Sequence, residues 1–172
     1  MTPNTKPPLK VLILCTGNSA RSILGEYLLR KIGRGRFETF SAGSKPTGRV
    51  NPLAVRVLRE KYGLDASAAR SKSWDEFKGV KFDFVITVCD HAREACPVWP
   101  GQPVLAHWGS PDPAAVEGTE EEKHWAFVQV ASQIARRAEL LCALPEAKLL
   151  DGLAVRAIGE QEKLENETGM KR

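Results

Sequence analysis

Short apolar runs alternate with helical patterns along this chain. Residues 10–14 (KVLIL) and 84–88 (FVITV) are continuous apolar runs, which is typical of strands buried on both faces. Residues 36–43 alternate apolar and polar side chains, and residues 103–108 form a weaker apolar run. The pattern therefore predicts four strands.

Helical periodicity fills the gaps between these runs, over residues 20–32, 52–62 and a long segment after Thr119. Asn51-Pro52 and the T-E-E-E sequence from Thr119 are signals for helix starts. A short polar segment, residues 71–77, predicts one or two helical turns. We expect the long helix to bury one stripe of side chains: Trp125, Val128, Ala131, Ala135, Ala138 and Cys142.

Strands that alternate with helices predict an α/β fold with a parallel sheet covered on both faces. We expect a three-layer sandwich as a single catalytic domain over residues 9–145, after a flexible tail of residues 1–8. Residues 146–172 form a charged C-terminal extension, for which we expect a surface helix. In such folds ligands bind beyond the carboxyl ends of the strands, where Cys15 and Cys89 both lie.

Composition narrows the class of protein. The chain has 172 residues and a net charge of +4, with no cluster of Lys and Arg among aromatics, which argues against nucleic-acid binding. No apolar run approaches the ~20 residues of a membrane span, and the polar start carries no signal region. We therefore expect a cytoplasmic protein without a membrane partner, whose cysteines are reduced and available for chemistry.

The sequence C-T-G-N-S-A-R-S follows the first strand and opens the first helix, from Cys15 to Ser22. Gly17 and Asn18 suit the tight backbone turns of such a loop. Successive N–H groups and the helix dipole form an anion nest, and Arg21 adds a bidentate grip on an oxyanion. The same field favours the thiolate of Cys15, and Ser22 or Ser19 is placed to hydrogen-bond it.

This loop closely resembles the catalytic loop C-x5-R-S of the low-molecular-weight protein tyrosine phosphatase superfamily. The resemblance implies a four-stranded parallel sheet flanked by helices and a nucleophilic Cys15 that attacks an oxyanion centre. It also implies an oxyanion cradle made by Thr16, Gly17, Asn18, Ser19, Ala20, Arg21 and Ser22.

Asp112 in the segment G-S-P-D-P-A-A matches the general-acid loop of that superfamily in type and order. A carboxylic acid there would protonate the leaving group, although Asp-Pro also commonly caps a turn. Phosphatases that take phosphotyrosine usually carry an aromatic residue after this Asp-Pro pair. Here Ala114 and Ala115 follow, which favours a smaller substrate.

Cys89 ends an apolar strand, and Cys96 comes seven residues later. Two helical turns would separate them by about 10 Å, whereas a disulfide needs Cα atoms within about 7 Å, so pairing would require a helix to unwind. Metal binding by Cys89, His91 and Cys96 and two unreactive thiols are alternatives. A thiol relay fits best, in which Cys89 attacks a group held on Cys15 and Cys96 resolves the disulfide.

Together with H-W-G-S-P-D-P-A, this segment resembles the thioredoxin-coupled arsenate reductases, over about residues 9–144. The resemblance implies an oxidoreductase of arsenical detoxification: Cys15 attacks arsenate, Asp112 helps water leave, and Cys89 releases arsenite as Cys15–Cys89 forms. Cys96 then produces Cys89–Cys96, which an external dithiol protein reduces. We expect thioredoxin, or alternatively glutaredoxin, as partner, with a monomeric protein and no tightly bound cofactor. A weak phosphatase side activity is also expected.

The residues alone leave two other functions open. One is a phosphatase whose additional cysteines have no role, and the other is a non-catalytic module that binds an oxyanion or arsenite, in which Arg21 and Asp112 would have no function. Certain family members bind potassium through Asn, Glu, Ser and Asp side chains. Asn18, Glu26 and Ser41 match three of these ligands, while the acidic fourth position falls at or near Ser73, with Asp75 as a nearby substitute. The resemblance thus offers a potassium site with an incomplete ligand set, and no other metal is expected.

Overall fold

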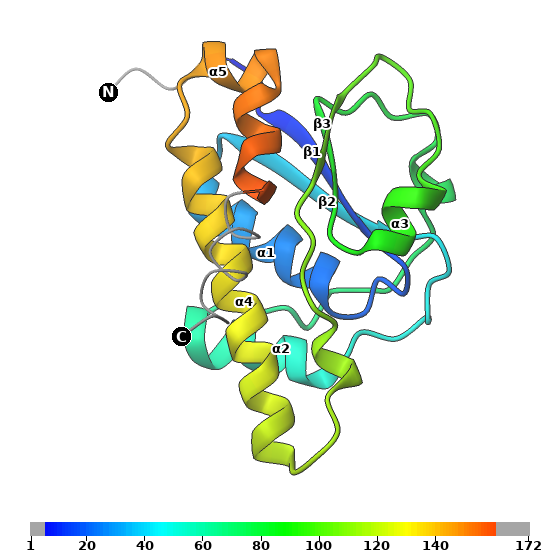
Figure 1. Ribbon diagram of the computed structural model, residues 1–172, viewed down its shortest axis with the longest axis vertical. Coiled ribbons are helices and arrows are strands. Elements are labelled where there is room, and N and C mark those ends of the chain that lie inside the picture. Colours follow the sequence, from blue (N-terminus) through cyan, green and yellow to red (C-terminus); the bar gives the residue numbers. More distant parts are fainter. Residues whose placement is uncertain (1–5, 161–172) are drawn as a thin grey trace.

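Four parallel strands form the centre of the computed structural model, which describes residues 6–160 (Figure 1). They are β1 (Leu9–Cys15), β2 (Phe37–Gly43), β3 (Phe84–Thr87) and β4 (Val104–His107), in the spatial order β2-β1-β3-β4. Cys15 pairs with Gly43, and Leu14 pairs with Thr87. The carboxyl ends of the strands therefore meet at one edge of the sheet, as the sequence predicted.

The helices begin and end close to the predicted positions. They are α1 (Arg21–Gly33), α2 (Pro52–Tyr62), α3 (Asp90–Ala95), α4 (Glu120–Cys142) and α5 (Glu146–Asp151), with 3₁₀ turns η1 (Trp74–Phe77) and η2 (Pro113–Ala115). Asn51 caps α2, and Thr119 forms a capping box with Glu122 at the start of α4. Each such cap stabilises its helix by about 1 kcal/mol.

Two clusters of buried apolar side chains hold the layers together. One is centred on the sheet, where Val11 to Leu14 of β1 are almost fully buried. The other lies among α1, α2 and α4, and α1 and α4 run side by side in Figure 1. On β2, Phe40 packs edge-to-face on Phe77 and Phe82. Because β1 is packed in the first cluster and α1 in the second, the position of the N-terminus of α1 relative to the end of β1 is fixed.

The stripe predicted for α4 is only partly right. Ala131, Ala135 and Ala138 are buried, but Trp125 is 59% exposed. Phe127 and Ile134, which are not in the predicted stripe, are buried instead. They belong to the face of α4 that packs against α1 and α2, so the buried face is rotated slightly from the predicted stripe.

The start of the C-terminal extension is more deeply packed than a surface helix. Residues 153–160 form a further helical segment after α5, and Leu149, Val155 and Ile158 are buried in the sheet-centred cluster. A Cβ atom at Gly159 would lie 2.1 Å from the backbone oxygen of His107, so only glycine allows this close approach. Residues 1–5 of the predicted tail and residues 161–172 lie outside the described residues.

None of the helices within residues 6–160 combines the length and apolarity needed to cross a bilayer.

Candidate active site

The Cys15 loop, residues 15–22, connects β1 to α1 at the carboxyl edge of the sheet. Cys15 Sγ lies 2.8 Å from Ser22 Oγ, and the backbone N–H of Asn18 donates to the same sulfur at 3.2 Å. Asn18 has a left-handed backbone (φ 46°), which supplies the tight turn expected there. The loop therefore places one backbone N–H group and one hydroxyl group against the Cys15 sulfur.

Neighbouring segments hold the loop from outside. Its carbonyls at Cys15, Thr16, Gly17 and Ser19 accept hydrogen bonds from the backbone N–H groups of Ser44, Lys45, Thr47 and Asn51. A Cβ atom at Gly43 would lie 2.4 Å from the oxygen of Thr16, so glycine is required at the end of β2. No side-chain hydrogen bond caps α1 at Ala20. The first N–H groups of this helix are thus free to bind an anion.

Arg21 links the Cys15 loop to the predicted acid loop. Its Nη1 donates to the backbone oxygen of Ser110 at 3.0 Å, and its Nη2 lies 4.0 Å from Asp112 Oδ2. Asp112 Oδ1 accepts from the backbone N–H of Ala114 at 3.0 Å and caps η2. One carboxylate oxygen therefore has the capping role that the sequence allowed, and the other faces Arg21.

Arg137 is a supporting residue that sequence reasoning missed. Its side chain is 1% exposed, and its Nη1 donates to Gly109 O at 3.0 Å and to Ser110 Oγ at 3.3 Å. Two arginines, Arg21 and Arg137, therefore hold the segment that carries Asp112. No sequence signal separates Arg137 from an ordinary charged residue on the long helix.

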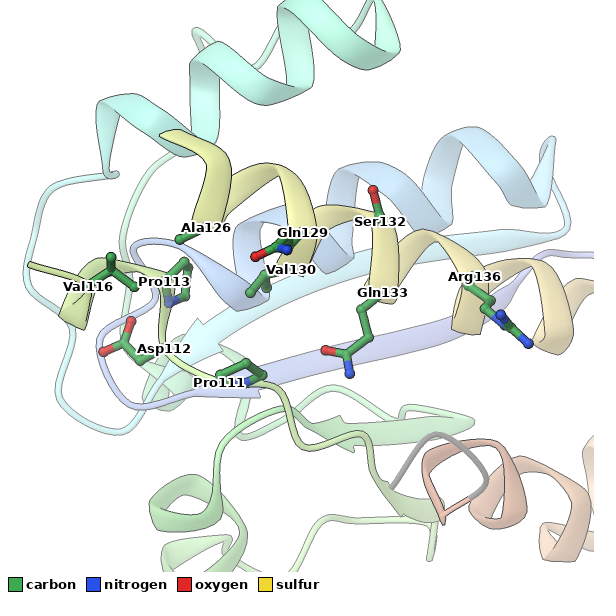
Figure 2. A pocket seen from close by; sticks show the side chains of 10 residues that line it. All are labelled: Pro111, Asp112, Pro113, Val116, Ala126, Gln129, Val130, Ser132, Gln133 and Arg136. Carbon is green, nitrogen blue, oxygen red and sulfur yellow. The ribbon is translucent and has the colours of Figure 1, made fainter. Parts of the chain in front are cut away.

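A cavity of about 510 Å³ lies beside the acid loop, between η2 and α4. Figure 2 shows Asp112 and Val116 on the loop side and Gln129 and Gln133 on the helix side. No aromatic side chain lines this cavity. The lining near Asp112 is therefore made of proline, valine and amide side chains, and Ala114 and Ala115 lie outside it.

Cys89 lies directly beside the Cys15 loop. Its Sγ is 3.3 Å from Thr16 Oγ1, and the side chain is 7% exposed. The same sulfur accepts from the backbone N–H of Ala92 and caps α3. The structure therefore brings the second predicted cysteine to the loop that contains the first.

Cys96 lies at the other end of α3, which occupies residues 90–95 of the relay segment, our name for residues 89–96. A helical rise of ~1.5 Å per residue over the seven steps from Cys89 to Cys96 corresponds to about 10 Å. Burial raises the pKa of the Cys96 thiol. Cys96 is thus held away from Cys89 by an intact helix.

His107 is a second residue that the sequence did not single out for a contact with the relay segment. Its Nδ1 lies 2.8 Å from Thr87 Oγ1, and its Nε2 lies 2.9 Å from Asp90 Oδ1. His107 therefore fastens the first turn of α3 to the end of β4. Within residues 6–160, no three His, Cys, Asp or Glu side chains converge on a metal position, and the predicted alternative ligand His91 is exposed.

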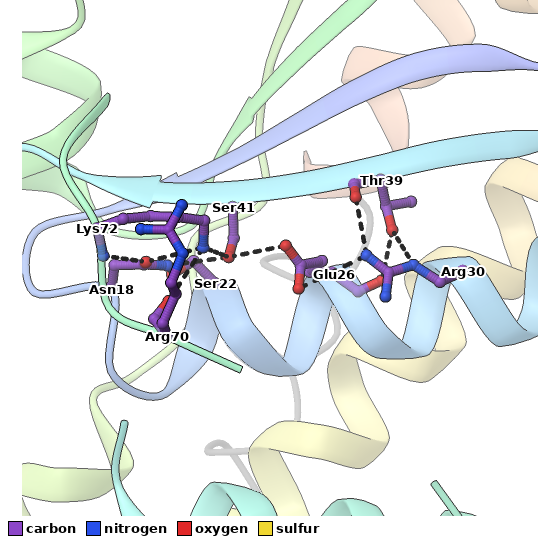
Figure 3. A network of polar contacts seen from close by, with 8 residues as sticks. All are labelled: Asn18, Ser22, Glu26, Arg30, Thr39, Ser41, Arg70 and Lys72. Atoms are coloured by element: carbon purple, nitrogen blue, oxygen red, sulfur yellow. Dashed lines mark hydrogen bonds and ion pairs between the residues drawn. The ribbon is translucent and has the colours of Figure 1, made fainter. Parts of the chain in front are cut away.

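The three residues matched to a potassium site do come together. Asn18 Nδ2 donates to Ser41 Oγ at 3.0 Å, and Ser41 Oγ donates to Glu26 Oε1 at 3.3 Å. Figure 3 shows the side chain of Lys72 beside them. The substitute ligand Asp75 instead lies 3.0 Å from Lys78 Nζ. The potassium set therefore stays without its acidic fourth ligand, and an ammonium group lies beside the three residues that were matched.

Comparisons with known proteins point to one family. The family model described as low molecular weight phosphotyrosine protein phosphatase matches residues 10–150. A protein of Halalkalibacterium halodurans named arsenate reductase is 40% identical over 127 residues, which are 74% of this chain and 90% of that protein.

Solved structures show the same fold. One titled "An arsenate reductase in the phosphate binding state" superimposes with a TM-score of 0.67 at 28% identity, covering 78% of this chain and 97% of the other. A thioredoxin-dependent arsenate reductase of Corynebacterium glutamicum gives a TM-score of 0.53 at 25% identity, covering 79% of this chain and 64% of the other. The chain described here belongs to the low molecular weight phosphotyrosine protein phosphatase family.

Proposed function

We propose that this protein reduces arsenate to arsenite by a thiol relay through Cys15, Cys89 and Cys96. The contact of 3.3 Å between Thr16 Oγ1 and Cys89 Sγ supports this proposal most directly. A phosphatase needs one nucleophile in the loop, whereas a reductase needs a second thiol within reach of the first. The names of the relatives point to the same reaction.

In the first step the Cys15 thiolate attacks arsenic(V). An S–As bond forms, an As–O bond breaks, and the oxygen leaves as water after Asp112 donates a proton. Arg21 and the N–H groups of the loop bind the remaining oxygens and hold the arsenic in line with the sulfur. The side chain of Asp112 is 47% exposed, so solvent can reach the carboxyl group that acts as the acid.

The second step transfers two electrons. The Cys89 thiolate attacks Cys15 Sγ and forms a disulfide, while the electron pair of the S–As bond stays on arsenic and arsenite leaves as arsenic(III). Cys96 then attacks Cys89 Sγ, forms the Cys89–Cys96 disulfide and frees Cys15 as a thiolate. An external dithiol protein reduces this disulfide, and the thioredoxin-dependent relative makes thioredoxin our preferred reductant over glutaredoxin. No tightly bound cofactor enters these steps, and a reducing compartment such as the cytoplasm suits them.

The test is arsenate turnover with a thioredoxin system in the parent and in Cys89→Ser, with Cys142→Ser as the matched cysteine control. We expect Cys142→Ser to cycle like the parent and Cys89→Ser to stop with an adduct on Cys15, detected by mass spectrometry after acid quench. Cys96→Ser should release one arsenite per protein and then stop as Cys15–Cys89. The proposal fails if Cys89→Ser turns over arsenate at the parent rate. Hydrolysis of an aryl phosphate should survive in both variants, because it needs only Cys15, Arg21 and Asp112.

A further inference from the structure

Lys72 places a cation behind the Cys15 loop. The lysine is 9% exposed, and its backbone oxygen accepts from Gly43 N at the end of β2. Its Nζ lies 3.0 Å from Arg70 O, 3.4 Å from Asn18 Oδ1 and 3.4 Å from Ser41 Oγ (Figure 3). Three oxygen atoms thus surround the ammonium group in the interior.

This arrangement does not fit a resident potassium ion. Asn18 and Ser41, two of the matched ligands, already contact the ammonium group, and the third, Glu26, is linked to it through Ser41. A monovalent cation there would be repelled by the charge of Lys72. The chain therefore supplies its own positive charge where an ion would otherwise bind.

The surrounding charges balance this lysine. Burial lowers the pKa of Lys72, and the nearby Glu26 carboxylate opposes that shift, as does Glu76 more weakly. Arg70 and Arg30 face the lysine as well and lower its pKa further. Burial raises the pKa of Glu26, with Lys72 as the first opposing charge. Lys72 and Glu26 therefore stabilise each other's charged forms in a buried setting.

The hydrogen bonds run in one direction from Lys72 to the sulfur. Both the backbone N–H and Nζ of Lys72 donate to Asn18 Oδ1, so the Asn18 amide must turn its Nδ2 toward Ser22 Oγ, 2.8 Å away. Ser22 Oγ accepts this bond and lies 2.8 Å from Cys15 Sγ, so its hydroxyl group can donate to a Cys15 thiolate. A hydroxyl that donates to sulfur favours the thiolate.

We propose that Lys72 is a positioning residue whose ammonium group acts as a built-in monovalent cation, fixing Asn18 and Ser22 so that Cys15 is held as a thiolate. The nucleophile then needs no added potassium. This inference rests on Cys15 being the nucleophile of the proposed function. It predicts that removal of the ammonium creates a demand for a small external cation, since Glu26 and the three oxygens would remain.

The experiment measures alkylation of Cys15 by iodoacetamide, followed by mass spectrometry of its peptide, from pH 5 to 9 in potassium, ammonium or choline chloride at equal ionic strength. We expect the parent to react equally in all three salts. In choline, Lys72→Ala should react about tenfold more slowly near neutral pH, with its pH profile displaced upward, because a hydrogen bond to the charged sulfur is weakened. Potassium or ammonium should restore most of the rate, which a purely structural role would not explain.

Lys72→Met keeps most of the alkyl stem and removes the charge, and Lys78→Met is the matched control at an exposed lysine. Melting curves check that each variant is folded. Parent-like alkylation in a folded Lys72→Met, a slow rate that neither cation restores in Lys72→Ala, or a potassium requirement in the parent would each overturn the proposal. Loss of arsenate turnover in the parent, with the Lys72 effect on alkylation intact, would reject only the reductase function.

Discussion

The Cys15 loop and the relay segment carry cysteines of the same proposed reaction but are built in opposite ways. In the loop, Asn18 and Ser22 are fully buried, and backbone bonds from residues 44–51 hold the carbonyls. In the relay segment, the helix α3 has only six residues, of which Ala92 alone is buried. A nucleophile gains from fixed geometry, whereas two cysteines about 10 Å apart can pair only if the helix between them unwinds.

The largest effect is expected from substitution of Arg21, which tests the fixed geometry of the Cys15 loop. Arg21→Lys keeps one positive charge but loses the planar fork and the bond to Ser110 O. We expect kcat/KM for arsenate to fall about 100- to 1000-fold, as when a donor to a developing oxyanion is removed. Steady-state assays would measure this, with Arg56→Lys on the exposed face of α2 as control. A loss below about tenfold would mean that the backbone cradle alone binds the oxyanion.

Asp112→Asn separates the two roles that the sequence left open for this residue. An asparagine side chain keeps the cap on Ala114 N but cannot donate the acid proton. We therefore expect an unchanged melting temperature and a first turnover about 100-fold slower, measured as arsenite released in a rapid-quench experiment. Asp112→Ala should lose both the cap and the acid, so its melting temperature and its first-turnover rate should both fall. If Asn and Ala lower rate and stability together, the carboxylate acts as a cap rather than as the acid.

The same contrast explains what the sequence could predict. The Cys15 loop is continuous in sequence, so one motif identifies Cys15, Arg21 and the turn at Asn18. Lys72, Arg137 and His107 act through contacts with segments that lie 17 to 54 residues away. Lys72 stands in a polar segment and Arg137 on a long helix, where charged residues are usually exposed, and His107 is a lone polar residue at the end of a weak apolar run. Their contacts therefore become visible only in the packed structure. The burial of Val155 was missed for the same reason, since a few apolar side chains among many charges carry little pattern.

The other half of the comparison, the unwinding of α3, is tested at Glu94, an exposed position of that helix. Glycine there costs the helix about 1 kcal/mol relative to alanine, so Glu94→Gly should unwind more readily than Glu94→Ala. We expect Cys89–Cys96 to form about fivefold faster after a single turnover, followed by quenched-flow mass spectrometry. Alkylation of Cys15 should not change. Equal rates of disulfide formation in the two variants would show that unwinding of α3 does not limit the relay.

The smallest effect concerns the contact that fastens α3 to the sheet. Burial lowers the pKa of His107, and the hydrogen bond to Asp90 opposes this without reversing it. Because the unfolded histidine titrates near pH 6.5, the unfolded state takes up the proton first as pH falls from about 7 to 5, and the folded state loses stability. His107→Gln removes this group and should cost about 1 kcal/mol at pH 7.5.

Thermal unfolding of the parent and of His107→Gln at pH 7.5 and pH 5 measures this effect, with the exposed His91→Gln as control. The stability advantage of the parent should shrink on acidification, since only the parent must keep the half-buried imidazole of His107 neutral as the pH falls. An advantage that grows instead would mean that a charged His107 pairs with Asp90 in the folded state. In that case acidification would strengthen the contact between His107 and Asp90 that fastens α3. The relay segment would then be held more firmly at low pH and would differ less from the Cys15 loop.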